Sequence, residues 1–475
     1  MPESPLPHAV AAMFPPASER ADVDAWLSRA FADLAPLIQA GPVAPTIDMD
    51  AFRTQLRGFD FERPLAFEGV LQWTLQQMQH GIVQMSNPRY FGLFNPGAAF
   101  PAQCADRVAA FFNPQLASSA SSPVPVEIES HVIRAMAHRA GLGPDATGHF
   151  ATGGSEANYT ALILALTAAH PGFASDGARA FSGPPKFYTS RECHIAWLKI
   201  AHQAGIGRSA LRLIDTDGHG RLDPEALARA IAADRAGGAV PVMVVATAGT
   251  TGGGMIDPLH GCADIARAGK LWFHVDAAWG GAALAAERLR PLLDGIERAD
   301  SITIDAHKWL ATTMGCAMFI TSHGALLSEA FHASTSFMPS SLAASDPYLN
   351  SVQWSRRFLG LRLFFVLATA GWEGIGAHVE RSVAVVARVR DALVARGWTV
   401  ANDSPLAVLD VVPPAALGEV RTLVRRVVAA GRAWVAPTNF EGRDVVRICA
   451  THGETSESDI AALVASLDLP MTGRP

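Results

Sequence analysis

The stretch 301-SITIDAHKWL-310 joins a short strand to three chemically versatile side chains. Its first five residues have the length and composition of a buried strand, and Asp305, His307 and Lys308 lie at its end. A lysine placed just after a buried strand is poorly solvated, which makes its amine a usable nucleophile. The alternative interpretation is a surface lysine that follows an ordinary strand.

The basic composition of the chain favours the first interpretation. Of the 38 basic residues, 34 are Arg and four are Lys, at positions 186, 199, 270 and 308. Codon bias in a GC-rich genome explains a general preference for Arg. Arg cannot form a Schiff base or release a proton near neutral pH, whereas Lys can do both. Arg would serve equally well at three of these positions, and Lys308 is the one where the chemistry requires Lys.

A second short strand, in 271-LWFHVDAAWGG-281, ends on Asp276. Ligands of parallel α/β sheets bind at the carboxyl ends of the strands. An aspartate at that place can hold a cationic ring nitrogen or a metal, and the small residues Ala277 and Ala278 would let a flat ring lie close. The alternative is an aspartate that caps the next turn.

The stretch 151-ATGGSEANYTAL-162 predicts an anion site. Gly153 and Gly154 allow a tight turn, Ser155 is a natural N-cap, and an amphipathic helix follows. The free N–H groups and dipole of such a helix start attract phosphate. The spacing matches neither the nucleoside-triphosphate nor the dinucleotide motif. A capped helix without a ligand is the alternative.

His194, in 190-SRECHIAWLKIAHQAGIG-207, is the fourth candidate, although a lone histidine is more often structural. Together the four stretches require a ligand with a phosphate, a protonatable ring nitrogen and an aldehyde for the lysine. Pyridoxal 5′-phosphate meets these requirements. The five widely spaced cysteines include no C-x-x-C pair, so we expect no disulfide framework and no metal site.

The organisation of the chain predicts an α/β fold. A length of 475 residues allows two or three domains, and 49% hydrophobic residues suffice for a large core. Apolar strands at 241–248, 271–276, 301–305 and 316–321 alternate with helices, which indicates a mostly parallel sheet covered on both faces. We expect an N-terminal helical arm (1–80), a large ligand-binding domain (81–354) and a small α+β domain (355–475), the last beginning with a long helix over 355–371.

Charge and patterning exclude several kinds of partner and location. A formal charge of −6 argues against nucleic acid and anionic membranes. The N-terminus has no secretory signal pattern, and the longest apolar run is half a membrane span. We therefore expect a soluble protein, and the cysteine usage favours the cytoplasm.

The order of the motifs resembles that of the group II pyridoxal-phosphate-dependent amino-acid decarboxylases. The similarity comprises T-x-G-S-E-A-N, C-H at 193–194, V-A-T-A-G-T-T at 245–251, H-V-D-A-A and D-A-H-K-W, and it runs from about residue 85 to the C-terminus. The family includes aromatic amino-acid, glutamate and cysteine-sulfinate decarboxylases. The resemblance implies a fold-type I homodimer that shares its active sites between subunits and turns an amino acid into an amine and CO₂.

The resemblance also implies roles around the cofactor ring. Lys308 would carry the cofactor as a Schiff base, and Asp276 would pair with the pyridinium nitrogen. His194 would stack on one face of the ring and Ala278 would lie on the other. Thr247 would support the ring face or the substrate carboxylate.

The same motifs imply roles at the phosphate and the substrate. Gly154, Ser155 and His307 would hold the phosphate. Phe94, in 87-NPRYFGLFNPGAAFPAQ-103, would form a wall of the substrate pocket. Arg447 is a candidate partner for a substrate carboxylate, as are Arg89, Arg356 and Arg357. Aromatic and acidic substrates both remain open.

One position departs from the family pattern. Aromatic-type members carry a loop tyrosine implicated in returning a proton to the substrate, and here we place Phe337 at that position. In plant relatives, Phe there accompanies a switch to oxidative deamination, which gives an aldehyde, ammonia and hydrogen peroxide. Decarboxylation to the amine remains the main expectation, because Tyr348, His194 or Lys308 could supply the proton. An aminotransferase, an aldolase and a non-catalytic regulator are weaker alternatives.

Overall fold

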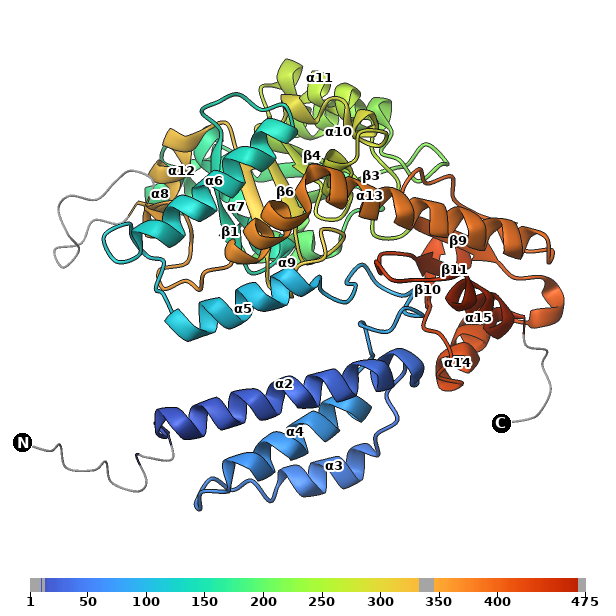
Figure 1. Ribbon diagram of the computed structural model, residues 1–475. Coiled ribbons are helices and arrows are strands. Elements are labelled where there is room, and N and C mark those ends of the chain that lie inside the picture. The colour runs from blue at the N-terminus through green and yellow to red at the C-terminus, as the bar shows by residue number, and fades with distance from the viewer. Residues whose placement is uncertain (1–9, 11–12, 333–345, 469–475) are drawn as a thin grey trace, which may run out of the picture.

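The computed structural model describes residue 10, residues 13–332 and residues 346–468. Three parts are visible in Figure 1: a central α/β body, a smaller sheet near the C-terminus, and a separate layer of N-terminal helices. The N-terminal layer consists of α2 (Ala17–Ala40), α3 (Met49–Leu56) and α4 (Phe67–Gly81). The boundaries expected after residues 80 and 354 stay predictions.

The body is built on a seven-stranded sheet in the order β1-β7-β6-β5-β4-β2-β3. Strands β2 to β6 run parallel, whereas β7 is antiparallel to both of its neighbours, β1 and β6. The mostly parallel α/β sheet predicted from the sequence is therefore confirmed. The strands are β1 (Thr147–Ala151), β2 (Pro185–Ser190), β3 (Leu211–Ile214), β4 (Val240–Thr247), β5 (Trp272–Asp276), β6 (Ser301–Asp305) and β7 (Ala317–Thr321).

Helices cover both faces of this sheet, as an apolar parallel sheet requires. On one face α7 (Gly154–Ala169) crosses the central strands, flanked by α9 (Ala196–Gln203) and α12 (Gly324–Phe331). On the other face lie α6 (Pro123–Arg139), α10 (Pro224–Ala236) and α11 (Leu259–Gly269). Helix α5 (Phe100–Phe112) packs on α13, and the short α8 (Phe173–Asp176) follows α7.

Helix α13 (Leu361–Val394) leads from the body to the small sheet. Gly371 interrupts it with a φ of 62°, a conformation that glycine adopts at little cost. The expected helix over 355–371 begins only at Leu361. The preceding residues are not helical, because the carbonyl of Arg356 accepts from the N–H of Leu116 and its side chain is buried.

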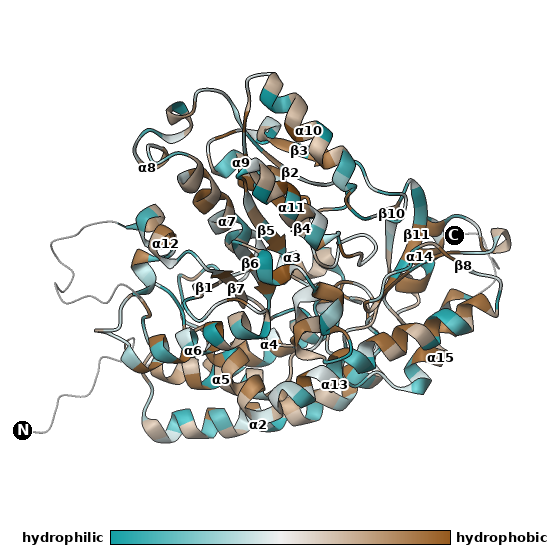
Figure 2. Cartoon of the chain, turned by 90° about the horizontal axis from the view of Figure 1, so that it is seen from above, coloured by the Kyte–Doolittle hydropathy of each residue, from teal (hydrophilic) through white to brown (hydrophobic). Residues whose placement is uncertain are grey.

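The small sheet is antiparallel, in the order β10-β11-β9-β8. Its strands are β8 (Thr399–Val400), β9 (Val408–Val412), β10 (Ala436–Phe440) and β11 (Arg443–Cys449). Helix α14 (Val420–Ala429) packs against this sheet, and α15 (Glu457–Leu467) packs against α13 and α14. Figure 2 shows the hydropathy of this unit together with that of the body.

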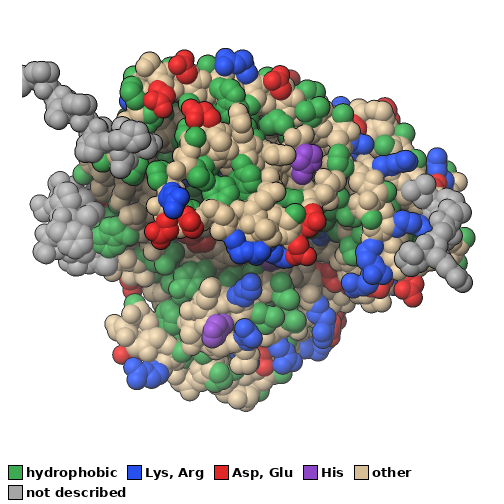
Figure 3. All heavy atoms as spheres, turned by 90° about the horizontal axis from the view of Figure 1, so that it is seen from below, with side chains coloured by type: hydrophobic (Ala, Val, Ile, Leu, Met, Phe, Trp, Pro, Cys, Tyr) green, Lys and Arg blue, Asp and Glu red, His purple; other side chains and the backbone are tan. Residues whose placement is uncertain are grey.

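The N-terminal layer leaves apolar side chains uncovered. Helices α2, α3 and α4 contain no buried residue, and Phe111 and Phe112 of α5 are 84% and 73% exposed. In Figure 3, which views the molecule from below, hydrophobic patches lie between charged ones. Within the described part of the chain, every helix is too short or too polar to cross a bilayer.

Candidate active site

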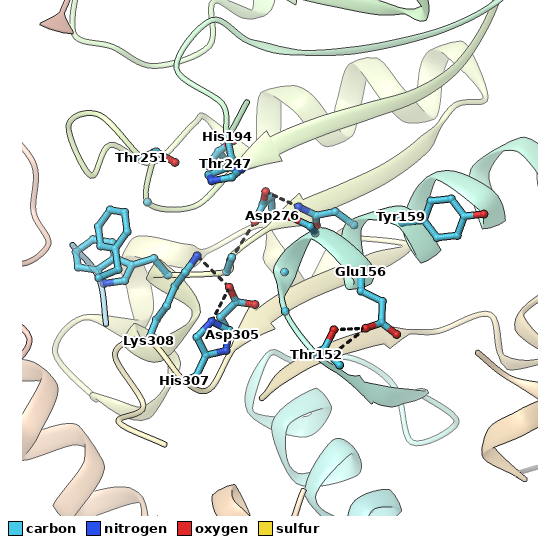
Figure 4. Close-up of a pocket in the computed structure, with 18 of the residues that line it drawn as sticks. Thr152, Glu156, Tyr159, His194, Thr247, Thr251, Asp276, Asp305, His307 and Lys308 are labelled. Carbon is cyan, nitrogen blue, oxygen red and sulfur yellow. Dashed lines mark hydrogen bonds and ion pairs between the residues drawn. The ribbon is translucent and has the colours of Figure 1, made fainter. Parts of the chain in front are cut away.

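A cavity of about 730 Å³ lies where β4, β5 and β6 end at their carboxyl termini. This volume is in the range of small-molecule and cofactor sites. Strands, the start of α7 and the loop before α9 all contribute to its wall (Figure 4). The cavity brings together nine of the residues singled out in the sequence: Phe94, Gly154, Ser155, His194, Thr247, Asp276, Ala278, His307 and Lys308.

The amine of Lys308 points into this cavity from the turn that follows β6. Its Nζ lies 2.9 Å from Oδ2 of Asp305, and the two side chains are 19% and 3% exposed. The turn is closed by the N–H of Lys308, which donates to the carbonyl of Asp305. The amine also lies 5.8 Å from the ring centre of Phe94. The only anionic partner that holds this amine within the described residues is therefore Asp305.

His307 is fixed by the backbone of the neighbouring strand. Its Nδ1 lies 2.9 Å from the carbonyl oxygen of Cys316 and 3.3 Å from the backbone nitrogen of the same residue. Its Nε2 lies 3.8 Å from Oδ2 of Asp305. The ring is almost fully buried, and Figure 4 shows it beside the Asp305 carboxylate. Its orientation is thus set before any ligand binds.

Asp276 ends β5 with both carboxylate oxygens occupied. Oδ1 accepts from the N–H of Ala278, and Oδ2 accepts from the side-chain amide of Asn158 at 2.8 Å. The carboxyl group is buried and faces the cavity. The two hydrogen bonds hold the carboxylate in one orientation at the end of β5.

The start of α7 differs in one detail from the sequence expectation. The helix begins at Gly154, with Gly153 in the N-cap position and no side-chain cap, so the prediction of Ser155 as N-cap is wrong. Ser155 lies inside the first turn. A Cβ on Gly154 would lie 2.9 Å from both oxygens of Asp305. Glycine is therefore required for the helix start to approach the end of β6.

Thr247 and His194 occupy the other side of the cavity (Figure 4). The N–H of Thr247 donates to Oδ2 of Asp257, and burial raises the pKa of Asp257 to about 7. The Thr247 hydroxyl is buried and has no hydrogen-bond partner within the described residues. His194 lies two residues before α9, is exposed, and accepts from the N–H of Ala196 through Nδ1.

An aromatic stack closes the cavity on the Lys308 side. The Phe94 ring lies 4.8 Å from that of Trp279, which stacks on Trp309 at 4.6 Å. Arg447 lies outside the cavity lining, with its guanidinium 5.0 Å from the Phe94 ring. It donates to the carbonyls of Thr251 and Gly92. Arg447 therefore supports the cavity wall from behind.

The other candidate arginines are engaged elsewhere. Arg89 donates to the carbonyl of Gly41 at the end of α2. Arg356 forms a buried ion pair with Glu129, and Arg357 pairs with Asp106. None of the three lines the cavity. Their role as carboxylate partners stays a prediction that these contacts do not support.

Two expectations concern the loop before α13. Phe337 lies outside the described residues. Tyr348 is buried against Ala117 and lies 4.8 Å from the Trp354 ring, and it does not line the cavity. The alternative in which Tyr348 supplies a hydroxyl to the site has no support in this arrangement.

Three residues of the site were missed or undervalued in the sequence. Asp305 is the partner of Lys308, Asn158 is the partner of Asp276, and Trp279 packs on Phe94. Asn158 stands one helical turn after Gly154, which places both on the same side of α7. That spacing was the one available signal for Asn158.

The described residues fit pyridoxal 5′-phosphate. Lys308 would bind its aldehyde, Asp276 its ring nitrogen, and the N–H groups at the start of α7 its phosphate. The Thr247 hydroxyl, which has no hydrogen-bond partner within the described residues, would gain one from the cofactor. Within the described residues, no three His, Cys, Asp or Glu side chains converge as metal ligands.

Comparison with known proteins agrees with this chemistry. Residues 61–400 match the conserved domain of pyridoxal-dependent decarboxylases. The acidic amino acid decarboxylase GADL1 of Mus musculus is 33% identical over 65% of this chain and 57% of its own length. The matched segment therefore spans less than two thirds of this relative.

Two solved structures resemble the whole fold. The crystal structure of mouse CSAD has a TM-score of 0.88 and 27% identity, and the match covers 94% of this chain and 98% of that one. The structure of Oryza sativa TDC with PLP and tryptamine has a TM-score of 0.87 and 26% identity, and the match covers 94% and 97%. The second of these contains the cofactor that the present cavity fits.

Proposed function

We propose a function from one premise: the chain belongs to the pyridoxal-dependent decarboxylase family. The function is decarboxylation of an L-amino acid to its amine and CO₂ with pyridoxal 5′-phosphate as cofactor. The observation that carries the proposal is the placement of Lys308 and Asp276 in one cavity with the start of α7. Of the four lysines, all of them described, only Lys308 lines that cavity.

Each side chain has a task that follows from its position. Asp305 holds the Lys308 amine in place, and Asp276 holds the proton of the ring nitrogen. An ion pair near 4 Å is worth about 4 kcal/mol at an effective dielectric of 20. When bound, the cofactor supplies the electron sink that makes loss of CO₂ feasible. His194, which lines the cavity, would stack on the cofactor ring.

The substrate side of the site is apolar with a cation behind it. Phe94 and Trp279 exclude water from the space beside Lys308. Arg447 keeps Phe94 in position and places positive charge nearby. GADL1 is named for acidic substrates, and the TDC structure holds tryptamine. We propose an aromatic or acidic L-amino acid as the substrate.

The exposed apolar surface supports the homodimer that the family resemblance implies, and active sites shared between its subunits belong to the same proposal. Phe100, Phe111 and Phe112 of α5 are all largely exposed, as are Phe31 and Leu37 of α2. Isolated soluble chains rarely leave so many large apolar side chains uncovered. Light scattering coupled to gel filtration tests this, and a monomer at working concentration would contradict it.

The five free cysteines are compatible with a reducing cytoplasm.

The alternative reaction rests on Phe337. An aldehyde product with ammonia and hydrogen peroxide requires oxygen, whereas an amine product does not. A panel of L-amino acids, incubated under air and under nitrogen, distinguishes the two when amine, CO₂ and peroxide are all measured. We expect equal amounts of CO₂ and amine in both atmospheres. Peroxide equal to CO₂ under air, without amine, would contradict the proposal.

A further inference from the structure

A chain of hydrogen bonds runs from the interior of the sheet to Asp276. The indole N–H of Trp272 lies 2.8 Å from the hydroxyl of Ser301, and that hydroxyl lies 2.8 Å from Nδ1 of His274. Nε2 of His274 lies 3.0 Å from Oδ1 of Asn158, whose amide donates to Asp276 at 2.8 Å. All five side chains are buried.

The fold brings these residues together from three elements. Trp272, His274 and Asp276 alternate along β5, so their side chains share one face of the sheet. Ser301 begins β6 in register with His274. Asn158 reaches the same face from α7, which crosses above β5 and β6. The chain of bonds therefore depends on tertiary packing across 118 residues of sequence between Asn158 and Asp276.

The groups at the two ends, Trp272 and Asp276, are consistent with one direction for the hydrogen bonds between them. An indole N–H only donates, so Ser301 accepts from Trp272 and has its own proton free for Nδ1 of His274. The imidazole then carries its proton on Nε2 and donates to the Asn158 oxygen. The amide nitrogen of Asn158 is left facing Asp276. At the other end an ionised carboxylate only accepts, which requires the same direction.

The neutral state of His274 agrees with this assignment. Burial lowers the pKa of His274 to about 4, so the ring carries a single proton at neutral pH. Thr303 offers a second, longer contact of 3.5 Å to Nε2. A neutral ring with one proton can accept at Nδ1 and donate at Nε2, as the chain requires.

We propose that Trp272, Ser301, His274 and Asn158 form a one-directional hydrogen-bond relay that holds Asp276 as an acceptor for the cofactor's ring nitrogen. Asn158 and His274 are positioning residues, because they act through Asp276. Without the relay the Asn158 amide could rotate and present its oxygen to the carboxylate. Asp276 would then lose a donor and compete more strongly for the ring proton. The inference concerns the cofactor and is independent of which amino acid is decarboxylated.

The test compares two ligands on the full chain, after removal of cofactor and reconstitution. One is pyridoxal 5′-phosphate and the other is its analogue with carbon in place of the ring nitrogen. The variants are Asn158→Leu, His274→Phe and the double substitution. Ser466→Ala serves as control, because it removes a buried hydroxyl from α15, far from the cavity. Binding is followed by fluorescence quenching, so no turnover is needed.

Asn158→Leu should weaken binding of pyridoxal 5′-phosphate about 10-fold, as loss of a hydrogen bond to a charged group does. His274→Phe should weaken it less, and should add nothing in the Asn158→Leu background. Binding of the carbon analogue should stay unchanged in all variants. Equal weakening for both ligands, or additive effects in the double variant, would overturn the relay.

A second measurement requires no variant. Histidine ¹⁵N shifts in the wild-type chain report which ring nitrogen of His274 is protonated, with the ring signals assigned through their correlation to the His274 backbone. The relay predicts a proton on Nε2. A proton on Nδ1 would overturn it even if the variants failed to fold. Failure of the decarboxylation proposal would leave both binding and tautomer results unaffected, so the two can be judged separately.

Discussion

The carboxylate of Asp305 lies 2.9 Å from the Nζ of Lys308 and also faces Gly154 at the start of α7. One acidic group thus links the amine to the helix start that would bind phosphate. The distance between the end of β6 and α7 is set by the absence of a side chain at Gly154.

Gly154→Ala should disturb this arrangement. The new Cβ would lie 2.9 Å from both Asp305 oxygens and push the carboxylate away from Lys308. Displacements of about 1 Å near reacting groups cost about 100-fold in rate. We expect kcat/KM to fall by that order, with weaker cofactor binding. Gly143→Ala is the control, since nothing lies within 4 Å of its Cβ. Equal activity of the two variants would show that the close contact between the start of α7 and Asp305 is unimportant for catalysis.

Arg356→Ala should destabilise the fold without touching the site. Its guanidinium pairs with Glu129 at 2.5 Å, and both side chains are almost fully buried. Removing one partner of a buried ion pair costs about 3–5 kcal/mol. The free energy of unfolding in urea measures the loss. Arg357→Ala, which breaks an exposed pair with Asp106, should change it by less than about 1 kcal/mol. A similar loss of unfolding free energy in both variants would refute the distinction between the buried and the exposed ion pair.

His378 should make the protein sensitive to acid. Burial lowers its pKa to about 4, while Nε2 lies 3.2 Å from the Trp309 carbonyl. The unfolded chain therefore binds a proton near pH 6.5 that the folded chain does not accept until about pH 4. Stability falls as pH drops through that window. His378→Gln should lose about 2 kcal/mol less than wild type between pH 7.5 and 5. If the urea midpoints of wild type and His378→Gln fell by the same amount between pH 7.5 and 5, His378 would not be the source of the acid sensitivity.

Arg447→Ala tests whether this side chain binds the substrate directly and so determines selectivity. Arg447 supports Phe94 and the Thr251 carbonyl from outside the cavity lining. We expect kcat/KM to fall about 10-fold for acidic and aromatic amino acids alike, because the wall they share is loosened. Loss confined to acidic substrates would instead place the guanidinium in direct contact with the substrate carboxylate.

Local signals in the sequence predicted much of the site. The apolar strands that end on Asp276 and Asp305 were recognisable because a buried parallel strand has a distinctive composition. Lys308 stood out because Arg replaces Lys nearly everywhere else. Both strand ends lie at one edge of the sheet, so the meeting of Asp276 and Lys308 followed from topology.

Long-range contacts could not be predicted in the same way. Arg356 looked available in the sequence, but Glu129, 227 residues away, binds it. For Asn158 the sequence offered only its spacing from Gly154, which does not indicate the bond to Asp276. Helix α7 begins at Gly154 with Gly153 as its N-cap instead of Ser155, and a side chain is excluded at Gly154 because its Cβ would meet Asp305. In each case tertiary packing selected among locally acceptable alternatives.

The central claim is that Lys308 carries the cofactor, and borohydride reduction followed by peptide mass spectrometry tests it directly. Reduction of the bound cofactor leaves a stable pyridoxyl group on the lysine that held it. The account predicts this group on Lys308 alone among the four lysines, with no label and no turnover in Lys308→Arg. A label on Lys186, Lys199 or Lys270, or turnover by Lys308→Arg, would contradict it.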